Sequence, residues 1–166
     1  MPLAASRRRF LFVDQSLVPF ALNFVLNGAI AYALFRSAES VPFVGASSIV
    51  GDTVITSFLL PFATCLIVTG LIHKQVAAGK VLALSQAPRG GLGGFLGARG
   101  KALRGALLGL AAIALFAAPA LLAFSAAGVE QLPRDSFLWF KAGYAGAVAA
   151  IVQPAIAWLA LAPRAA

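Results

Sequence analysis

The chain has 166 residues, of which 61% are hydrophobic and 11% charged, and its formal net charge at pH 7 is +8. An ordinary soluble domain is roughly 45–50% apolar and about 25% charged, so this composition excludes a water-soluble surface and predicts a membrane protein. The basic residues flank the apolar runs and do not line one solvated face, which argues against nucleic acid as a partner. We therefore expect the chain to contact a lipid bilayer with anionic headgroups.

Four apolar runs follow one another and contain no Asp, Glu, Lys, Arg or His. They cover residues 15–35, 53–72, 105–129 and 142–163. A helix needs about 20 apolar residues to cross the hydrocarbon core, so each run is long enough for one crossing. With their flanks, the predicted spans are 15–35, 49–72, 105–127 and 138–161. The sequence thus predicts an all-α integral membrane protein, with four transmembrane helices in a compact bundle and a single membrane domain over residues 1–166.

The distribution of positive charge predicts the orientation. If all four runs span, ten of the 13 Lys and Arg residues fall on one side and three fall on the other. The smaller group is Arg36, Arg134 and Lys141. Positively charged loops favour the cytoplasmic side, so both termini and the loop 74–104 are expected to be cytoplasmic. The small size and this charge pattern favour a bacterial inner membrane.

The first predicted span carries two amides inside its apolar run, Asn23 and Asn27. Residues four apart share one helix face, and a buried amide in lipid seeks a partner on a neighbouring helix. We expect this face to pack against the polar side of the second span.

The second predicted span has a polar stripe on one side. At about 100° per residue, these residues fall within one sector of the helix: Asp52, Thr53, Thr56, Ser57, Leu60 and Thr64. Such groups often act as packing glue, each contributing about 0.6 kcal/mol. A continuous stripe also suits a water-lined or ligand-lined path, and the residues alone leave both interpretations open.

Asp52 and Lys141 are the charged residues closest to the predicted membrane interior. Asp52 caps the helix if the helix starts after Gly51. It is a membrane-embedded charge if the helix starts near Ala46, and an acid in that position is a functional-site hypothesis. Lys141 falls on the same predicted side, where it pairs with Asp52, extends to the headgroups or contacts a substrate.

The loop 74–104 is basic and rich in glycine, and it contains the sequence APRGGLGGFLGARGKALRG. Glycine disfavours a helix. The loop lacks the spacing of a phosphate-binding loop, because Ala102 follows Lys101 and no strand precedes the segment. We expect a flexible basic linker near anionic lipid.

Small residues on the last two spans predict close helix packing. Gly105 and Gly109 form a GxxxG pair, and Gly146 and Gln153 mark the corresponding side of the fourth span. Such surfaces let helices approach closely, either within one chain or between chains.

No catalytic constellation is present, because the sequence lacks a Ser–His–Asp arrangement, a paired acid site and a His/Cys cluster. We expect a protein that is not an enzyme and that holds no metal or cofactor. Two functions remain. The first is a channel or transporter subunit, assembled as a homo-oligomer, with a polar path along spans one and two. The second is an accessory or scaffolding subunit of a larger membrane complex that binds partner helices, lipid or pigment. The continuity of the stripe favours the first.

Overall fold

The structure is a computed structural model that describes residues 10–84 and 91–162. Its elements in chain order are the π-helical η1 (Phe10–Leu17), α2 (Val18–Leu34), β1 (Ser40–Pro42), α3 (Ile49–Ala77), α4 (Gly91–Gly97), α5 (Lys101–Ala112), the π-helical η2 (Ile113–Ala117), α6 (Ala118–Ala126), β2 (Gln131–Pro133) and α7 (Arg134–Ala160).

The described part of the chain has four helices that are long and apolar enough to cross a membrane. They are Val13–Leu34, Ile49–Ala77, Lys101–Ala126 and Arg134–Ala160, with lengths of 22, 29, 26 and 27 residues. Each exceeds the roughly 20 residues that one crossing needs. The prediction of four membrane-spanning helices is therefore confirmed at the level of length and composition.

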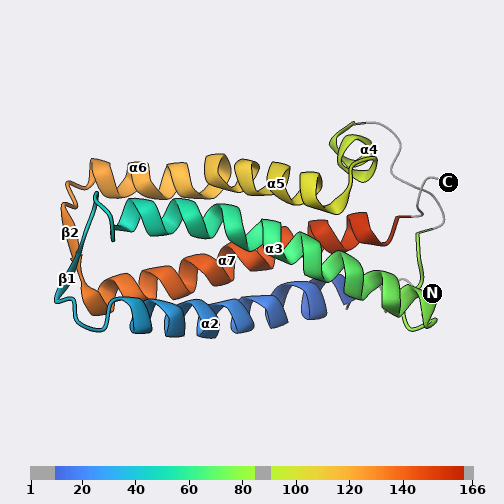
Figure 1. The fold of residues 1–166 in the computed structure, drawn as a ribbon, viewed down its shortest axis with the longest axis horizontal. Coiled ribbons are helices and arrows are strands. Elements are labelled where there is room, and N and C mark those ends of the chain that lie inside the picture. The colour runs from blue at the N-terminus through green and yellow to red at the C-terminus, as the bar shows by residue number, and fades with distance from the viewer. Residues whose placement is uncertain (1–9, 85–90, 163–166) are drawn as a thin grey trace.

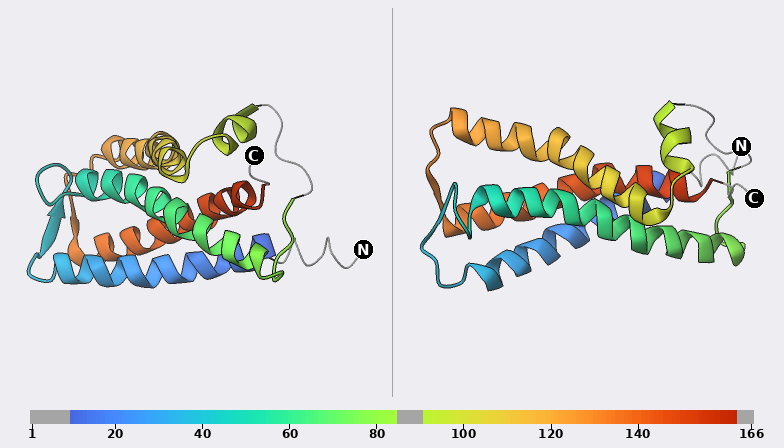
Figure 2. Two further views of the ribbon diagram at one scale, coloured as in Figure 1. Left: turned by 45° about the vertical axis from the view of Figure 1, so that its right-hand side comes forward. Right: turned by 45° about the horizontal axis from the view of Figure 1, so that its top comes forward.

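The helices lie side by side, and α7 has neighbours on both sides (Figure 1). It packs against α2 on one side and against α3 on the other, while α5 covers the opposite side of α3. The two views of Figure 2 show the same order, with α5 and α6 furthest from α2. Half of the apolar stretch of α7 is buried inside the protein, whereas 11–28% of the apolar stretch is buried in the other three helices. The fourth span is thus the central helix.

A short two-stranded ribbon joins the loops at one end, and this departs from the purely helical expectation. Strands β1 and β2 pair antiparallel, with Val41 opposite Leu132. Val41 is fully buried in a cluster with Phe35, Ile49 and Phe137, so an apolar core holds the two loops together. We call this the strand end; α4 lies at the other end of the molecule, the α4 end (Figure 1).

Helices occupy parts of the loop predicted over residues 74–104. Helix α3 continues to Ala77, α5 begins at Lys101, and α4 forms from Gly91 to Gly97 despite four glycines. The expectation that glycine prevents a helix here is wrong. Arg104 donates to the carbonyl groups of Leu96 and Gly97 and so satisfies acceptors that a helix terminus leaves free.

The small residues of α5 contact α3 within the chain. A Cβ added at Gly109 would lie 2.8 Å from the Phe58 carbonyl oxygen, and one at Gly105 would lie 3.1 Å from the Phe62 carbonyl oxygen. Gly146 of α7 approaches Phe20 of α2 in the same way, with a Phe20 ring carbon 3.0 Å from the added Cβ. These glycines allow close contacts between α3 and α5 and between α2 and α7.

Candidate functional site at the α3–α7 interface

The first turn of α3 places Asp52 inside the helix. Ser48 is the N-cap residue, and its Oγ accepts a hydrogen bond of 3.1 Å from the Gly51 amide. Asp52 is the fourth helical residue, and its own amide donates to the Ser48 carbonyl. The interpretation of Asp52 as the cap is therefore wrong, because Ser48 already occupies that position and satisfies the free amide.

Asp52 and Lys141 form a buried ion pair between α3 and α7. Lys141 Nζ donates to Asp52 Oδ1, and the two side chains are 5% and 13% exposed. Lys141 Nζ also lies 3.5 Å from Thr56 Oγ1. The alternative in which Lys141 extends to the headgroups is wrong. Lys141 lies on the side of α7 that faces α3, where its ammonium group contacts the Asp52 carboxylate.

The polar contact continues one turn further along α3. Ser57 Oγ lies 2.7 Å from the Thr53 carbonyl, to which it donates, and 2.5 Å from Tyr144 Oη. The sequence analysis missed Tyr144 as a site residue. Its position three residues after Lys141 places both residues on one face of a helix, and this spacing could have predicted that Tyr144 belongs to the site.

Thr53 carries the one buried polar side-chain atom that has no hydrogen-bond partner within residues 10–84 and 91–162. Thr53 is 1% exposed, and it follows the ion-paired Asp52 directly. Burying a hydroxyl without a partner costs roughly 1–3 kcal/mol, and native structures contain few such groups. The ion pair, Thr53, Thr56, Ser57 and Tyr144 together form what we call the α3–α7 polar site.

Beyond Ser57, the buried side of α3 follows a different line from the predicted one. It runs through Pro61, Cys65 and Thr69, with Cys65 Sγ 3.9 Å from Thr69 Oγ1. Thr64, which the sequence analysis placed at the end of the stripe, is half-buried and lies off this line. The reason is that residues four apart along Ser57, Pro61, Cys65 and Thr69 share one face, and α7 packs on that face.

Asn23 and Asn27 do not contact the hydroxyl stripe of α3, so the expected packing of span one on span two is wrong. Asn23 Nδ2 donates to the Pro19 carbonyl, and Asn27 Nδ2 donates to the Asn23 carbonyl, at 2.9 and 3.0 Å. Both bonds lie within the first span, and α7 separates that span from α3. Each of these amides thus donates a hydrogen bond within the first span rather than to α3.

Gln153 joins α7 to the first span near the α4 end. Its Nε2 lies 3.4 Å from Gln15 Oε1 of η1, and Gln15 is buried. This contact is separate from the α3–α7 polar site, and Gly146 likewise serves the packing between α2 and α7.

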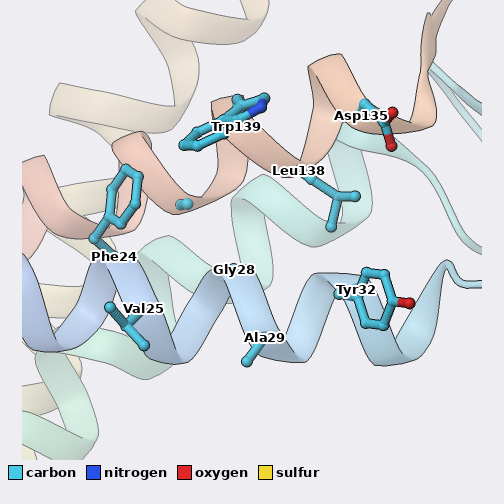
Figure 3. A pocket seen from close by; sticks show the side chains of 9 residues that line it. Phe24, Val25, Gly28, Ala29, Tyr32, Asp135, Leu138 and Trp139 are labelled. Atoms are coloured by element: carbon cyan, nitrogen blue, oxygen red, sulfur yellow. The ribbon is translucent and has the colours of Figure 1, made fainter.

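An apolar groove lies on the opposite side of α7, against α2 (Figure 3). Its volume is about 360 Å³, and Phe24, Gly28 and Tyr32 of α2 face Leu138 and Trp139 of α7. Trp139 is 70% exposed. The groove thus combines an exposed aromatic ring with a glycine floor, and both are available to a lipid chain or a helix.

Tyr144→Phe is expected to lower the free energy of unfolding by about 0.6 kcal/mol, the average for a polar contact between membrane helices. The change removes the contact with Ser57 Oγ and leaves the ring in place. Unfolding by sodium dodecyl sulfate in mixed micelles measures the effect. Tyr32→Phe, at a ring that is 60% exposed, is the control. Equal losses in the two variants would show that the Ser57–Tyr144 contact adds nothing.

The geometry of the polar site is suited to holding a charge inside a membrane. It combines a carboxylate, an ammonium group and four hydroxyl groups in one interface, and no three His, Cys, Asp or Glu side chains gather in the described ranges. No protein-family model, curated protein sequence or solved structure matches the chain.

Proposed function

We propose that the chain is a subunit of a small membrane transporter or channel, and that the α3–α7 polar site binds the cation or proton that it transports. The observation that carries this proposal is the buried Asp52–Lys141 pair between two helices that are long and apolar enough to cross a membrane. An ionisable residue in such a helix usually marks a substrate, ion or proton pathway.

The energetics of the pair favour a role beyond packing. A buried ion pair loses the hydration of both charges, and apolar residues of similar volume often hold two elements together equally well or better. Helices α3 and α7 already pack through apolar side chains, because Cys65 of α3 is buried in a cluster with Val148, Val152 and Ile156 of α7. An ion pair therefore stabilises helix packing poorly for the hydration it loses. It is better explained by the binding of a transported ion.

The proposed mechanism is an exchange of partners at Asp52. A proton or cation that binds the Asp52 carboxylate neutralises it, and the Lys141 ammonium then loses its partner. Thr56 Oγ1, 3.5 Å from Lys141 Nζ, is the nearest oxygen that can receive it. The Thr53 hydroxyl, which has no hydrogen-bond partner among the described residues, supplies a further polar group at the residue that follows Asp52. Each subunit encloses little volume with four helices, so a homo-oligomer completes the path.

We place the α4 end in the cytoplasm, with both chain termini on that side of a bacterial inner membrane. Lys74, Arg99, Lys101 and Arg104 belong to this end, while Arg36 and Arg134 lie near the strand end. The excess of positive charge favours the cytoplasm for the α4 end. Asp52 and Lys141 then face the external side.

Flux through vesicles tests the proposal. The full chain is reconstituted into phosphatidylethanolamine/phosphatidylglycerol vesicles that contain a pH-sensitive dye for protons or a sodium-sensitive dye for sodium ions, and a potassium diffusion potential drives the ion inward. The double variant Asp52→Leu/Lys141→Met removes both charges and leaves no charge unpaired. We expect it to reduce the flux of the wild-type protein to the level of protein-free vesicles.

Asp135→Asn is the matched control, because Asp135 is an acid near the same end of α7 whose side chain is 75% exposed. This variant is expected to keep the wild-type flux. The proposal fails if the wild-type protein gives no flux above protein-free vesicles, or if the double variant transports as the wild-type protein does.

The second candidate function is a non-catalytic accessory subunit of a larger membrane complex. The apolar groove between α2 and α7 favours it, because the exposed Trp139 and the glycine at position 28 offer a surface for a partner helix or lipid. An absence of flux, together with a stable larger complex after purification of the wild-type protein but not of Trp139→Ala, would favour this function.

A further inference from the structure

A second pocket lies at the α4 end, about one span away from the polar site. Its volume is about 620 Å³, and it is bounded by the last part of α3, the turn between α4 and α5, and the end of α7. Its wall includes one histidine and four permanently charged side chains, and no acid: His73, Lys74, Arg99, Lys101 and Arg104. A cavity of this size and charge is suited to a small anion, since ligand pockets measure about 300–1,000 Å³.

Arg104 forms a well-packed part of the pocket wall. Arg104 is 7% exposed, and its Nε and Nη2 donate to the carbonyl groups of Leu96, Gly97 and Arg99 at 3.1, 3.2 and 3.1 Å. These bonds hold the end of α4 and the following turn against α5. The charge of Arg104 is therefore fixed in place at the pocket, and only neutral carbonyl groups receive its hydrogen bonds.

The positive charge of the pocket is not neutralised by carboxylates within residues 10–84 and 91–162. The salt bridges in this part of the chain join Arg134 to Asp135 and Lys141 to Asp52, and both belong to the strand half of the molecule. The lysines and arginines of the pocket therefore share a positive field. Because like charges held close together repel, an anion in their midst is favourable.

The backbone adds to this preference. Helix α5 begins at Lys101, and its N-cap residue Gly100 makes no side-chain hydrogen bond to the helix. The first amides of a helix lack partners within it, and a helix N-terminus attracts negative charge. Gly100 and Lys101 both line the pocket, so these amides lie beside the cationic side chains.

The surroundings place the pocket at the level where hydrocarbon meets headgroups. The guanidinium of Arg99, in the turn after α4, lies 4.7 Å from the centre of the Phe95 ring of α4. Phe95 is 48% exposed and Leu92 is 80% exposed. A short helix with exposed apolar side chains beside cations is typical of a segment that lies in a membrane interface.

We propose that this pocket binds a phosphate group, carried either by an anionic lipid headgroup or by a soluble phosphate compound. Phosphate matches the observed donors, because arginine and lysine side chains and free helix amides all bind its oxygens. The site is independent of Asp52 and Lys141, and it is an addition to the transport proposal.

Binding to the full chain in an uncharged detergent tests the site. The probes are fluorescent phosphatidylglycerol, fluorescent phosphatidylcholine and, without lipid, inorganic phosphate. The variant Arg99→Gln/Lys101→Gln removes two charges from the pocket and keeps Arg104, which the fold needs. The matched control is Arg36→Gln/Lys80→Gln, which removes two exposed charges that do not line the pocket.

We expect the pocket variant to weaken binding of phosphatidylglycerol about 25-fold, at roughly fivefold for each charge removed, and the control to leave it unchanged. If phosphatidylglycerol binds in this way and inorganic phosphate alone does not, the source is the lipid. If inorganic phosphate binds to the wild-type protein and not to the pocket variant, the source is a soluble compound. The proposal is overturned if neither anionic probe binds, if phosphatidylcholine binds equally well, or if the two double variants lose affinity equally.

Discussion

Asp52→Asn is expected to lower the free energy of unfolding by about 3–5 kcal/mol, the cost of removing one partner of a buried ion pair. The change leaves the ammonium group of Lys141, a side chain that is 5% exposed, without a carboxylate. Its remaining polar neighbour, Thr56 Oγ1 at 3.5 Å, cannot neutralise a charge. Unfolding by sodium dodecyl sulfate in mixed micelles measures the loss, and Lys141→Met is expected to have a loss of the same order.

The double variant Asp52→Leu/Lys141→Met distinguishes the contribution of the ion pair from the cost of leaving one charge unpaired. It removes both charges together, so it should recover most of the stability that either single variant loses. Asp135→Asn, at an exposed acid, should change the free energy of unfolding by less than about 0.5 kcal/mol. Additive losses in the double variant would mean that Asp52 and Lys141 act separately and that the ion pair does not contribute to folding.

This stability measurement also supports the interpretation of the flux experiment. A double variant that folds as the wild-type protein does, and that no longer transports, has lost the charges and not the structure. A reversed pair, Asp52→Lys/Lys141→Asp, extends the comparison. If the pair serves packing alone, the reversed pair should restore both stability and flux. If Asp52 binds the transported cation, the reversed pair should restore stability alone.

Gly109→Ala is expected to lower the free energy of unfolding by about 1–3 kcal/mol, the usual cost of forcing extra volume into a packed interface. The added Cβ would lie 2.8 Å from both the Phe58 carbonyl oxygen and a Phe58 ring carbon. The ring can rotate away, but the carbonyl belongs to the α3 backbone. The two helices must therefore separate, and the same detergent titration reports the change.

Gly143→Ala is the matched control for this prediction. Gly143 lies inside α7, and a Cβ there would meet no atom within 4 Å. Replacing a helical glycine with alanine at an open position stabilises a helix by roughly 0.5–1 kcal/mol. The two substitutions thus have opposite expected signs. A stabilised Gly109→Ala variant would show that α3 and α5 are not in close contact.

Much of the helical framework follows from the sequence. The four runs without charged residues predict four helices of spanning length, and these are present at Val13–Leu34, Ile49–Ala77, Lys101–Ala126 and Arg134–Ala160. The boundaries were less accurate where the flanks are basic. Helix α3 extends to Ala77 and α5 starts at Lys101, because long basic side chains continue a helix beyond its apolar part.

The candidate site was only partly predictable. The stripe on α3 was visible from helical periodicity, and Lys141 was one possible partner of Asp52. The choice between a cap and an embedded charge was not visible, since Ser47, Ser48 and Asp52 are all residue types that begin helices. Tyr144 was missed, because a tyrosine near a span end is equally typical of the membrane interface.

The sequence by itself determined the membrane class and the number of spanning helices, because hydrophobic length is a property of contiguous residues and adds along the chain. The tertiary structure decided which helices meet. It places α7 beside α3, where the sequence analysis expected the first span, and it joins Asp52 to Lys141 across 89 positions. Such pairing depends on the shapes of whole helix faces: Gly146 receives Phe20, and Gly109 receives Phe58. The asparagines of the first span donate to carbonyl groups of their own helix. The polar side of α3 is instead contacted by Lys141 and Tyr144 of α7.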